Sequence, residues 1–379
     1  MRTGLVFEQI KAQLPQVVET LFSIIPSGVG SEGAIPKLSK QDEKRLLREG
    51  ARWAVSEGYG HQEDLSYMEE GGRLASADAA RVSERALERG LKQVGTLGSG
   101  NHFLEIGRVE EIYLPETADA LGLYSDQLVV LIHTGSRGLG YQVCEDSLKI
   151  MSKATSQYGI SLPDRQLACT PIQSPEGQDY LAAMAAAANY AWVNRQVIMN
   201  QAEKAFIKAL EISPKELGFS LIYDVCHNIA KIEEHLIDGK KRRLCVHRKG
   251  ATRAFAPGHP QIPPAYQQIG QPVLIPGDMG RYSYLLVGTE DAMVKTFGST
   301  CHGAGRMMSR SQSKKESQSI NIDEEMARRG VVARYQGRST MAEEMPHAYK
   351  DVADVVETMD LAGISKRVAR FRPVGVIKG

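Results

Sequence analysis

The chain has 379 residues, of which 42% are hydrophobic and 24% charged, and its formal net charge is +1. This balance is typical of a globular protein with a large core, and it excludes a chain whose overall charge attracts nucleic acid. The five cysteines form no C-x-x-C pair, which argues against a disulfide framework and a zinc ribbon. No apolar run reaches the length of a membrane span, and the first residues carry no signal-peptide pattern, so the expected location is cytoplasmic, without membrane contact.

Hydrophobic patterns predict helices and strands in mixed order along the chain. Helical spacing predicts helices over 5–24 with a break at Pro15, over 41–57 and 80–92, from 140 to about 156, and over 176–210. Apolar runs predict strands near 103–106, 127–133, 219–225, 243–248, 271–275 and 283–288. The tail is predicted to be helical as far as Arg372 and to close with a strand ending at Lys378. Without a clean βαβ alternation, the pattern favours an α+β fold in one compact domain over residues 1–379, with mixed sheets and surrounding helices.

One segment, from Gly298 to Arg306, places His302 among small residues and directly before Gly303. Glycines let backbone amides approach a phosphate closely, and a neutral imidazole can coordinate a metal, carry a proton or attack phosphorus. On this segment alone, a histidine held in a tight turn by backbone hydrogen bonds is the commoner arrangement.

Three further histidines favour a functional site over a structural turn, because each lies at one end of an apolar, strand-like run. His102 precedes one such run, and His133 and His227 end two others. Strand ends hold side chains rigidly, so these three and His302 predict one shared site in a chain with nine histidines. Imidazole suits zinc, manganese, iron, copper and nickel alike, so the identity of the metal stays open.

Glycine-containing loops near these histidines predict a phosphate site. Loops 136–138, 277–280 and 302–305 combine backbone donors with polar side chains. No P-loop motif occurs, and loop 95–100 does not lie between a strand and a helix as a dinucleotide-binding loop would. The basic segment 306–315 is typical of a solvated helix face or, alternatively, of a track for a nucleic-acid backbone. The basic run 240–243 is interpreted as a surface turn that could also touch phosphates.

Taken together, these segments resemble one family, the RtcB-type RNA ligases, which join spliced tRNA halves and repair RNA breaks. The resemblance runs from the first residues to the last. The motifs that carry it are GTLGSGNHFLEI (95–106), IHTGSRGLG (132–140), DVCHNIAK (224–231), VHRKGATRAF (246–255), IPGDMG (275–280), STCHGAGRMMSR (299–310) and VIKG (376–379).

The resemblance implies a ligase that depends on GTP and Mn²⁺. It implies that His302 attacks the α-phosphate of GTP and carries GMP, which passes to an RNA 3′-phosphate derived from a 2′,3′-cyclic phosphate, before a 5′-hydroxyl releases it. The implied manganese ligands are His102, His133 and His227. The implied partners are RNA ends, such as tRNA halves, and a small activator of the archease kind. The implied nucleotide pocket comprises Asn101, His102, Phe103, Leu104, Glu105, His227, Asn228, Pro276, Gly277, Asp278, Met279, Ser283, His302, Gly303, Ala304, Gly305 and Lys378.

The sequence departs from the family pattern in one respect. In the family, an aspartate and a cysteine within a short glycine-containing motif bind two manganese ions, and the cysteine bridges them. That motif would lie upstream of Met1, and none of the five cysteines has an equivalent context, so the expectation is an N-terminally truncated member. Two other functions therefore stay open: a remnant that binds guanine nucleotide or RNA without ligating, and a metal-dependent phosphatase or nuclease.

Overall fold

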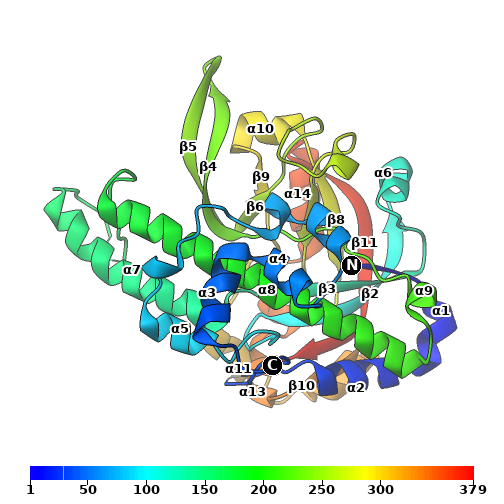
Figure 1. Ribbon diagram of the computed structural model, residues 1–379. Coiled ribbons are helices and arrows are strands. Elements are labelled where there is room, and N and C mark those ends of the chain that lie inside the picture. The colour runs from blue at the N-terminus through cyan, green and yellow to red at the C-terminus, as the bar shows by residue number, and fades with distance from the viewer. Residues whose placement is uncertain (29, 165) are drawn as a thin grey trace.

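A seven-stranded sheet organises the computed structural model, which describes residues 1–28, 30–164 and 166–379 (Figure 1). The strand order is β1-β3-β2-β11-β8-β7, and β10 pairs with β11 beside this path. Every pair is antiparallel except β10 with β11. The bounds are β1 Arg2–Val6, β2 Phe103–Ile112, β3 Gln127–His133, β7 Pro272–Ile275, β8 Ser283–Gly288, β10 Val332–Tyr335 and β11 Ser365–Lys378.

Helices cover both faces of this sheet. On β3, Leu128 and Val130 pack in one core cluster with α2 and α8, whereas Val129 between them packs in a cluster on the other face. This alternation follows from the two-residue period of a strand, and it explains why β3 reads as a continuous apolar run. The longest helix, α8, crosses in front of the sheet in Figure 1 and begins after Ser174, whose hydroxyl accepts from the Gly177 amide.

The helices have the following bounds: α1 Phe7–Ile10, α2 Leu14–Ile24, α3 Lys40–Glu49, α4 Ala51–Ser56, α5 Glu84–Gly90, α6 Pro115–Ala120, α7 Arg137–Gln157, α8 Pro175–Leu210, α9 Pro214–Leu217, α10 Glu290–Thr296, α11 Arg310–Glu316, α12 Ile322–Arg328, α13 Arg338–Glu343 and α14 Val352–Leu361. Among the described residues, none of these helices combines the length and the apolar character needed to cross a membrane.

Two small two-stranded sheets complete the fold. A hairpin projects from the body in Figure 1, and its two-residue turn, Asp238-Gly239, has positive φ at both positions, as an Asp-Gly hairpin turn requires. The basic run 240–243, interpreted from the sequence as a turn, is therefore the first part of the second hairpin strand. The four strands are β4 Asn228–Ile237 with β5 Lys240–Lys249, and β6 Ala251–Arg253 with β9 Ser299–Cys301.

The α+β class is confirmed, but two predicted elements are wrong. Within the described structure, segment 219–225 makes only single bridges, from Ser220 to Arg2 and from Asp224 to Met68. Its side chains are apolar because the segment is buried, although it does not pair as a strand. Consequently His227 precedes a strand instead of ending one. The tail is not helical up to Arg372, because β11 begins at Ser365 and pairs on both sides inside the main sheet.

Two predicted helices have different boundaries. The region 5–24 begins in strand β1, and Pro15 lies in the first turn of α2, where its missing N–H has no partner to lose. The region 41–57 is divided into α3 and α4 at Gly50, which has φ 59°. Such a backbone conformation is strained for any residue with a side chain.

A buried acid on α3 gives the fold a predicted pH dependence. Glu43 is almost wholly buried, and neither carboxyl oxygen has a hydrogen-bond partner among the described residues. Burial, with a smaller effect of Glu84, raises the pKa of Glu43 to about 8. A raised pKa in the folded state stabilises the fold fully below the ordinary pKa, near 4.5, and this contribution is lost as pH rises to about 8.

We therefore expect Glu43→Gln to become progressively more stable than the wild type between pH 5 and pH 8, because the amide stays neutral. Urea denaturation at several pH values measures this difference. Glu49→Gln is the matched control, since Glu49 lies on the same helix in a half-exposed pair with Arg45. A pH-independent difference between Glu43→Gln and the wild type contradicts the prediction.

Candidate functional site

Three strands of the main sheet bring their ends to one edge. β2 begins at Phe103 and β3 ends at His133, and these two residues lie opposite each other in the antiparallel pair. β11 ends at Lys378, which lies opposite Phe103 on the other side of β2. His102, His133 and Lys378 therefore meet at this edge, although more than 240 residues separate the last two in the sequence.

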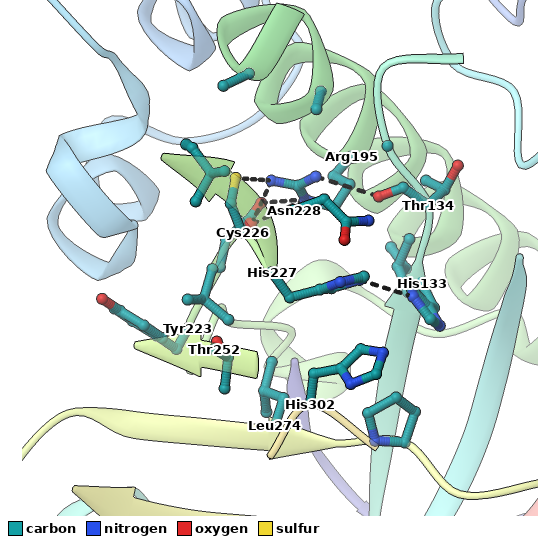
Figure 2. Close-up of a pocket in the computed structure, with 18 of the residues that line it drawn as sticks. His133, Thr134, Arg195, Tyr223, Cys226, His227, Asn228, Thr252, Leu274 and His302 are labelled. Carbon is teal, nitrogen blue, oxygen red and sulfur yellow. Dashed lines mark hydrogen bonds and ion pairs between the residues drawn. The ribbon is translucent and has the colours of Figure 1, made fainter. Parts of the chain in front are cut away.

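The remaining predicted histidines approach from the small sheets. His227 directly precedes β4, and His302 directly follows β9. The ring centroids lie 4.9 Å apart for His227 and His302, 5.2 Å for His133 and His227, and 6.1 Å for His102 and His133. The structure thus brings the four histidines into one cluster, and Figure 2 shows three of them facing one another.

His302 lies at the boundary of two adjoining cavities. The larger cavity has a volume of about 550 Å³ and is also lined by His227, Asn228 and Arg195. The smaller cavity, about 70 Å³, shares His133 and His302 with the larger one. Eleven residues of the predicted nucleotide pocket line it: Asn101, Phe103, Glu105, Pro276, Gly277, Asp278, Met279, His302, Gly303, Ala304 and Lys378.

Some predicted pocket residues lie elsewhere, and two lining residues were missed. His102, Leu104, Ser283 and Gly305 line neither cavity. Leu104 is fully buried in the core between the sheet and α8, because it points to the opposite face from Phe103. The missed residues are Glu344 and Tyr349. They lie in a loop-rich segment without periodicity, where no sequence signal marks them.

Of the four histidines, His133 and His227 have the geometry that best fits two ligands of one metal ion. The Nε2 atoms of His133 and His227 lie 3.1 Å apart, and their Nδ1 atoms are buried without partners in the described structure. Two nitrogens about 2.1 Å from one tetrahedral ion lie about 3.4 Å apart, so this pair fits two positions around an ion. Burial lowers the pKa of His227 to about 4 and lowers that of His133 well below its ordinary value, which keeps both rings in the neutral, ligating form.

The third predicted ligand is oriented differently. Nδ1 of His102 accepts a hydrogen bond from Nη1 of Arg137 at 2.9 Å. Burial and, after it, the charge of Arg137 lower the pKa of His102 to about 3. Across residues 1–28, 30–164 and 166–379, no three His, Cys, Asp or Glu side chains form a group that could hold a metal ion. The residues present therefore supply a pair of ligands that needs further donors.

Arg195 connects the two segments that carry this pair. It projects from α8, and its guanidinium contacts the Asp224 carboxylate at 2.7 Å. Nη1 donates to the carbonyl of Thr134, the residue after His133, and Nη2 donates to Sγ of Cys226, the residue before His227 (Figure 2). One buried side chain thus fixes both histidine segments relative to the long helix.

The smaller cavity combines one buried cation, Lys378, with three buried acids, Glu105, Asp278 and Glu344. Burial lowers the pKa of Lys378 to about 8 and raises that of Glu105 to about 8, although Ser283 donates to this carboxyl at 2.8 Å. Burial also raises the pKa of Asp278. At neutral pH this cavity therefore offers an ammonium donor beside the protonated Glu105 carboxyl, which can both donate and accept. His302 at its mouth also has a pKa lowered mainly by burial, so its imidazole is neutral and has a free electron pair.

Fold and site together define an α+β protein with a histidine-centred ligand site at the edge of its main sheet. A family model described as tRNA-splicing ligase RtcB matches residues 1–379. The chain is 53% identical over 379 residues to the tRNA-splicing ligase RtcB of Methanocaldococcus jannaschii and 52% identical to that of Archaeoglobus fulgidus. All of this chain aligns in both cases, and it spans 39% of the first relative and 78% of the second. The chain belongs to the RtcB family.

Proposed function

We propose that this chain carries the nucleophile and nucleotide pocket of an RNA ligase that uses GTP and Mn²⁺. The ligase joins an RNA 3′-phosphate or 2′,3′-cyclic phosphate to a 5′-hydroxyl through a GMP adduct on His302. The observation that carries the proposal is a neutral, half-buried His302 between the two cavities, next to the His133–His227 pair. The relatives named tRNA-splicing ligase support RNA ends, such as tRNA halves, as the substrate.

The proposed chemistry begins with the free electron pair of His302. A ring nitrogen forms a bond to the α-phosphorus of GTP while the bond to the β-phosphate oxygen breaks and pyrophosphate leaves. The GMP passes to the RNA 3′-phosphate, and attack by the 5′-hydroxyl oxygen forms the phosphodiester and releases GMP. Bound manganese would neutralise the triphosphate charge, with His133 and His227 among its ligands.

The acids and the lysine of the smaller cavity support a preference for guanine. Guanine presents acceptors at O6 and N7 and a donor at its N2 amino group. Lys378 can donate to an acceptor of the base, and Glu105 or Asp278 can accept from its amino group. Adenine presents its amino group where guanine has O6, so it would place a donor against the lysine.

The experiment is a joining assay with one RNA that ends in a 3′-phosphate and another that begins with a 5′-hydroxyl. We expect a joined product with GTP and Mn²⁺ and at least about a tenfold smaller yield with ATP, because one misplaced hydrogen bond costs about 1–3 kcal/mol. An archease-type activator can be added as a further arm. Guanine nucleotide binding without joining would favour the remnant, and phosphate release without joining would favour a phosphatase.

A further inference from the structure

We propose that the β4–β5 hairpin is an arm that binds the backbone of a single RNA strand and leads it to the histidine cluster. The proposal deepens the proposed function, on which the identity of the strand rests. It starts from the position of the hairpin, which is continuous with the site at both ends. β4 begins directly after His227. Gly250 alone connects β5 to β6, and β6 pairs with β9, the strand that ends before His302.

One face of the hairpin runs from the larger cavity to the tip. The register places Asn228 opposite Lys249 and Leu236 opposite Lys241, so the even-numbered residues of β4 share a face with the odd-numbered residues of β5. At the base of this face, Asn228, His247 and Lys249 line the larger cavity together with the histidines. We call the exposed side chains of this face the track: Asn228, Ile232, Glu234, Leu236, Lys241, Arg243, His247 and Lys249.

The track carries cations without partners. Lys241, Arg243 and Lys249 are exposed, and none of them makes an ion pair or a side-chain hydrogen bond with a described residue. Glu234 lies opposite Arg243 in the strand register, but their side chains form no ion pair. Arg45 on the body contrasts with them, since it pairs with two glutamates. Lys241 and Arg243 are two residues apart near the tip, and Lys249 lies at the base of the same face. Unpaired cations along one face of a strand suit a linear polyanion, because each can neutralise a phosphate at little cost to the fold.

The track also exposes apolar side chains. Leu236 is 70% exposed and Ile232 is 42% exposed, on an arm that projects away from the cores. Apolar surface beside unpaired cations matches a nucleic-acid strand, which presents charged phosphates and the flat faces of unpaired bases.

The opposite face of the hairpin fixes the direction of the arm. The two terminal nitrogens of buried Arg248, Nη1 and Nη2, donate to the Glu233 carboxylate at 2.7 and 2.8 Å. Nε of Arg248 donates to Oγ of Ser299 on β9, three residues before His302. The hairpin is thus attached to the strand that presents His302, so a chain bound along the track would reach that histidine.

The test compares two double variants with equal charge loss. Lys241→Ala with Arg243→Ala removes two track cations, and Lys149→Ala with Lys153→Ala removes two exposed lysines of α7 as the control. Binding of a fluorescent single-stranded RNA with a 3′-phosphate is measured by anisotropy at several salt concentrations. We expect the track variant to bind the RNA about tenfold more weakly. Its plot of log affinity against log salt concentration should be shallower by about 1.4, with the control unchanged.

A parallel measurement separates this proposal from the proposed function. All variants are incubated with GTP and Mn²⁺ and weighed by intact-mass spectrometry, because the substituted residues Lys241 and Arg243 line neither cavity. If the two double variants have the same RNA affinity and the same salt dependence, the proposal that the hairpin binds RNA is wrong, whether or not an adduct forms. Weaker RNA binding by the track variant alone supports the arm, even if no chain forms an adduct and the proposed ligase chemistry fails.

Discussion

Replacing His302 with alanine is expected to reduce GMP adduct formation by at least about a thousandfold, since loss of a covalent nucleophile leaves no group that forms the bond. The wild-type chain, incubated with GTP and Mn²⁺, should gain the mass of one GMP. The added mass should be labile to acid, as a phosphoramidate is. Intact-mass spectrometry measures both properties on the same sample.

The control is His61→Ala, which removes an exposed histidine whose ring pairs with Glu203, away from both cavities. This variant should form the adduct at the wild-type rate. An adduct of wild-type yield on His302→Ala would assign the nucleophile to another residue. Nucleotide binding must be measured in parallel, because His302 also lines the nucleotide cavity and its loss could weaken GTP binding alone.

The local patterns of the sequence predict much of the site because its parts lie at strand ends. His133 ends a continuous apolar run that forms β3 with the predicted bounds. The glycine loops at 277–280 and 302–305 were predicted from the sequence, and the resemblance supplied the terminal Lys378. Residues from both loops and Lys378 line one cavity. Sequence patterns carry this information because a strand end and a glycine turn are properties of a few neighbouring residues.

What the sequence could not predict depends on contacts between distant segments. The pairing of Arg137 with His102, which turns this histidine toward α7, joins two motifs through side-chain orientation. Tyr349 reaches the smaller cavity because Arg306 donates to its hydroxyl across 43 residues. The closing strand was predicted, but its first part, from Ser365 to Arg372, was wrongly predicted as helical. Phe371 lies there between two half-buried arginines, but the preceding helices obscured the change of period.

Glu69 is expected to be the most sensitive structural residue around the site. It is 1% exposed and contacts Nζ of Lys231 at 2.8 Å and Nε of Arg253 at 3.3 Å, and both cations are buried. It also accepts a hydrogen bond from the backbone amide of Cys226, next to His227. Burial alone would raise its pKa, but Lys231 and Arg253 outweigh burial and hold the pKa at about 2.

We expect Glu69→Gln to lower the free energy of unfolding by about 3–5 kcal/mol, because it leaves two buried cations undercompensated. Glu70→Gln is the matched control: this neighbour contacts the same two cations but is 29% exposed, so its loss should cost about 1 kcal/mol. Urea denaturation at pH 7 compares the two isosteric variants. Equal losses would show that burial of Glu69 does not decide the strength of these pairs.

The pH dependence gives an independent test of the same residue. Because the folded-state pKa of Glu69 is depressed, its contribution is fully present above about pH 4.5 and is lost as pH falls toward about 2. The difference in stability between the wild type and Glu69→Gln should therefore shrink across this range, while the difference for Glu70→Gln changes less. A Glu69→Gln difference that stays constant down to pH 2.5 would mean that the carboxylate is not held by Lys231 and Arg253.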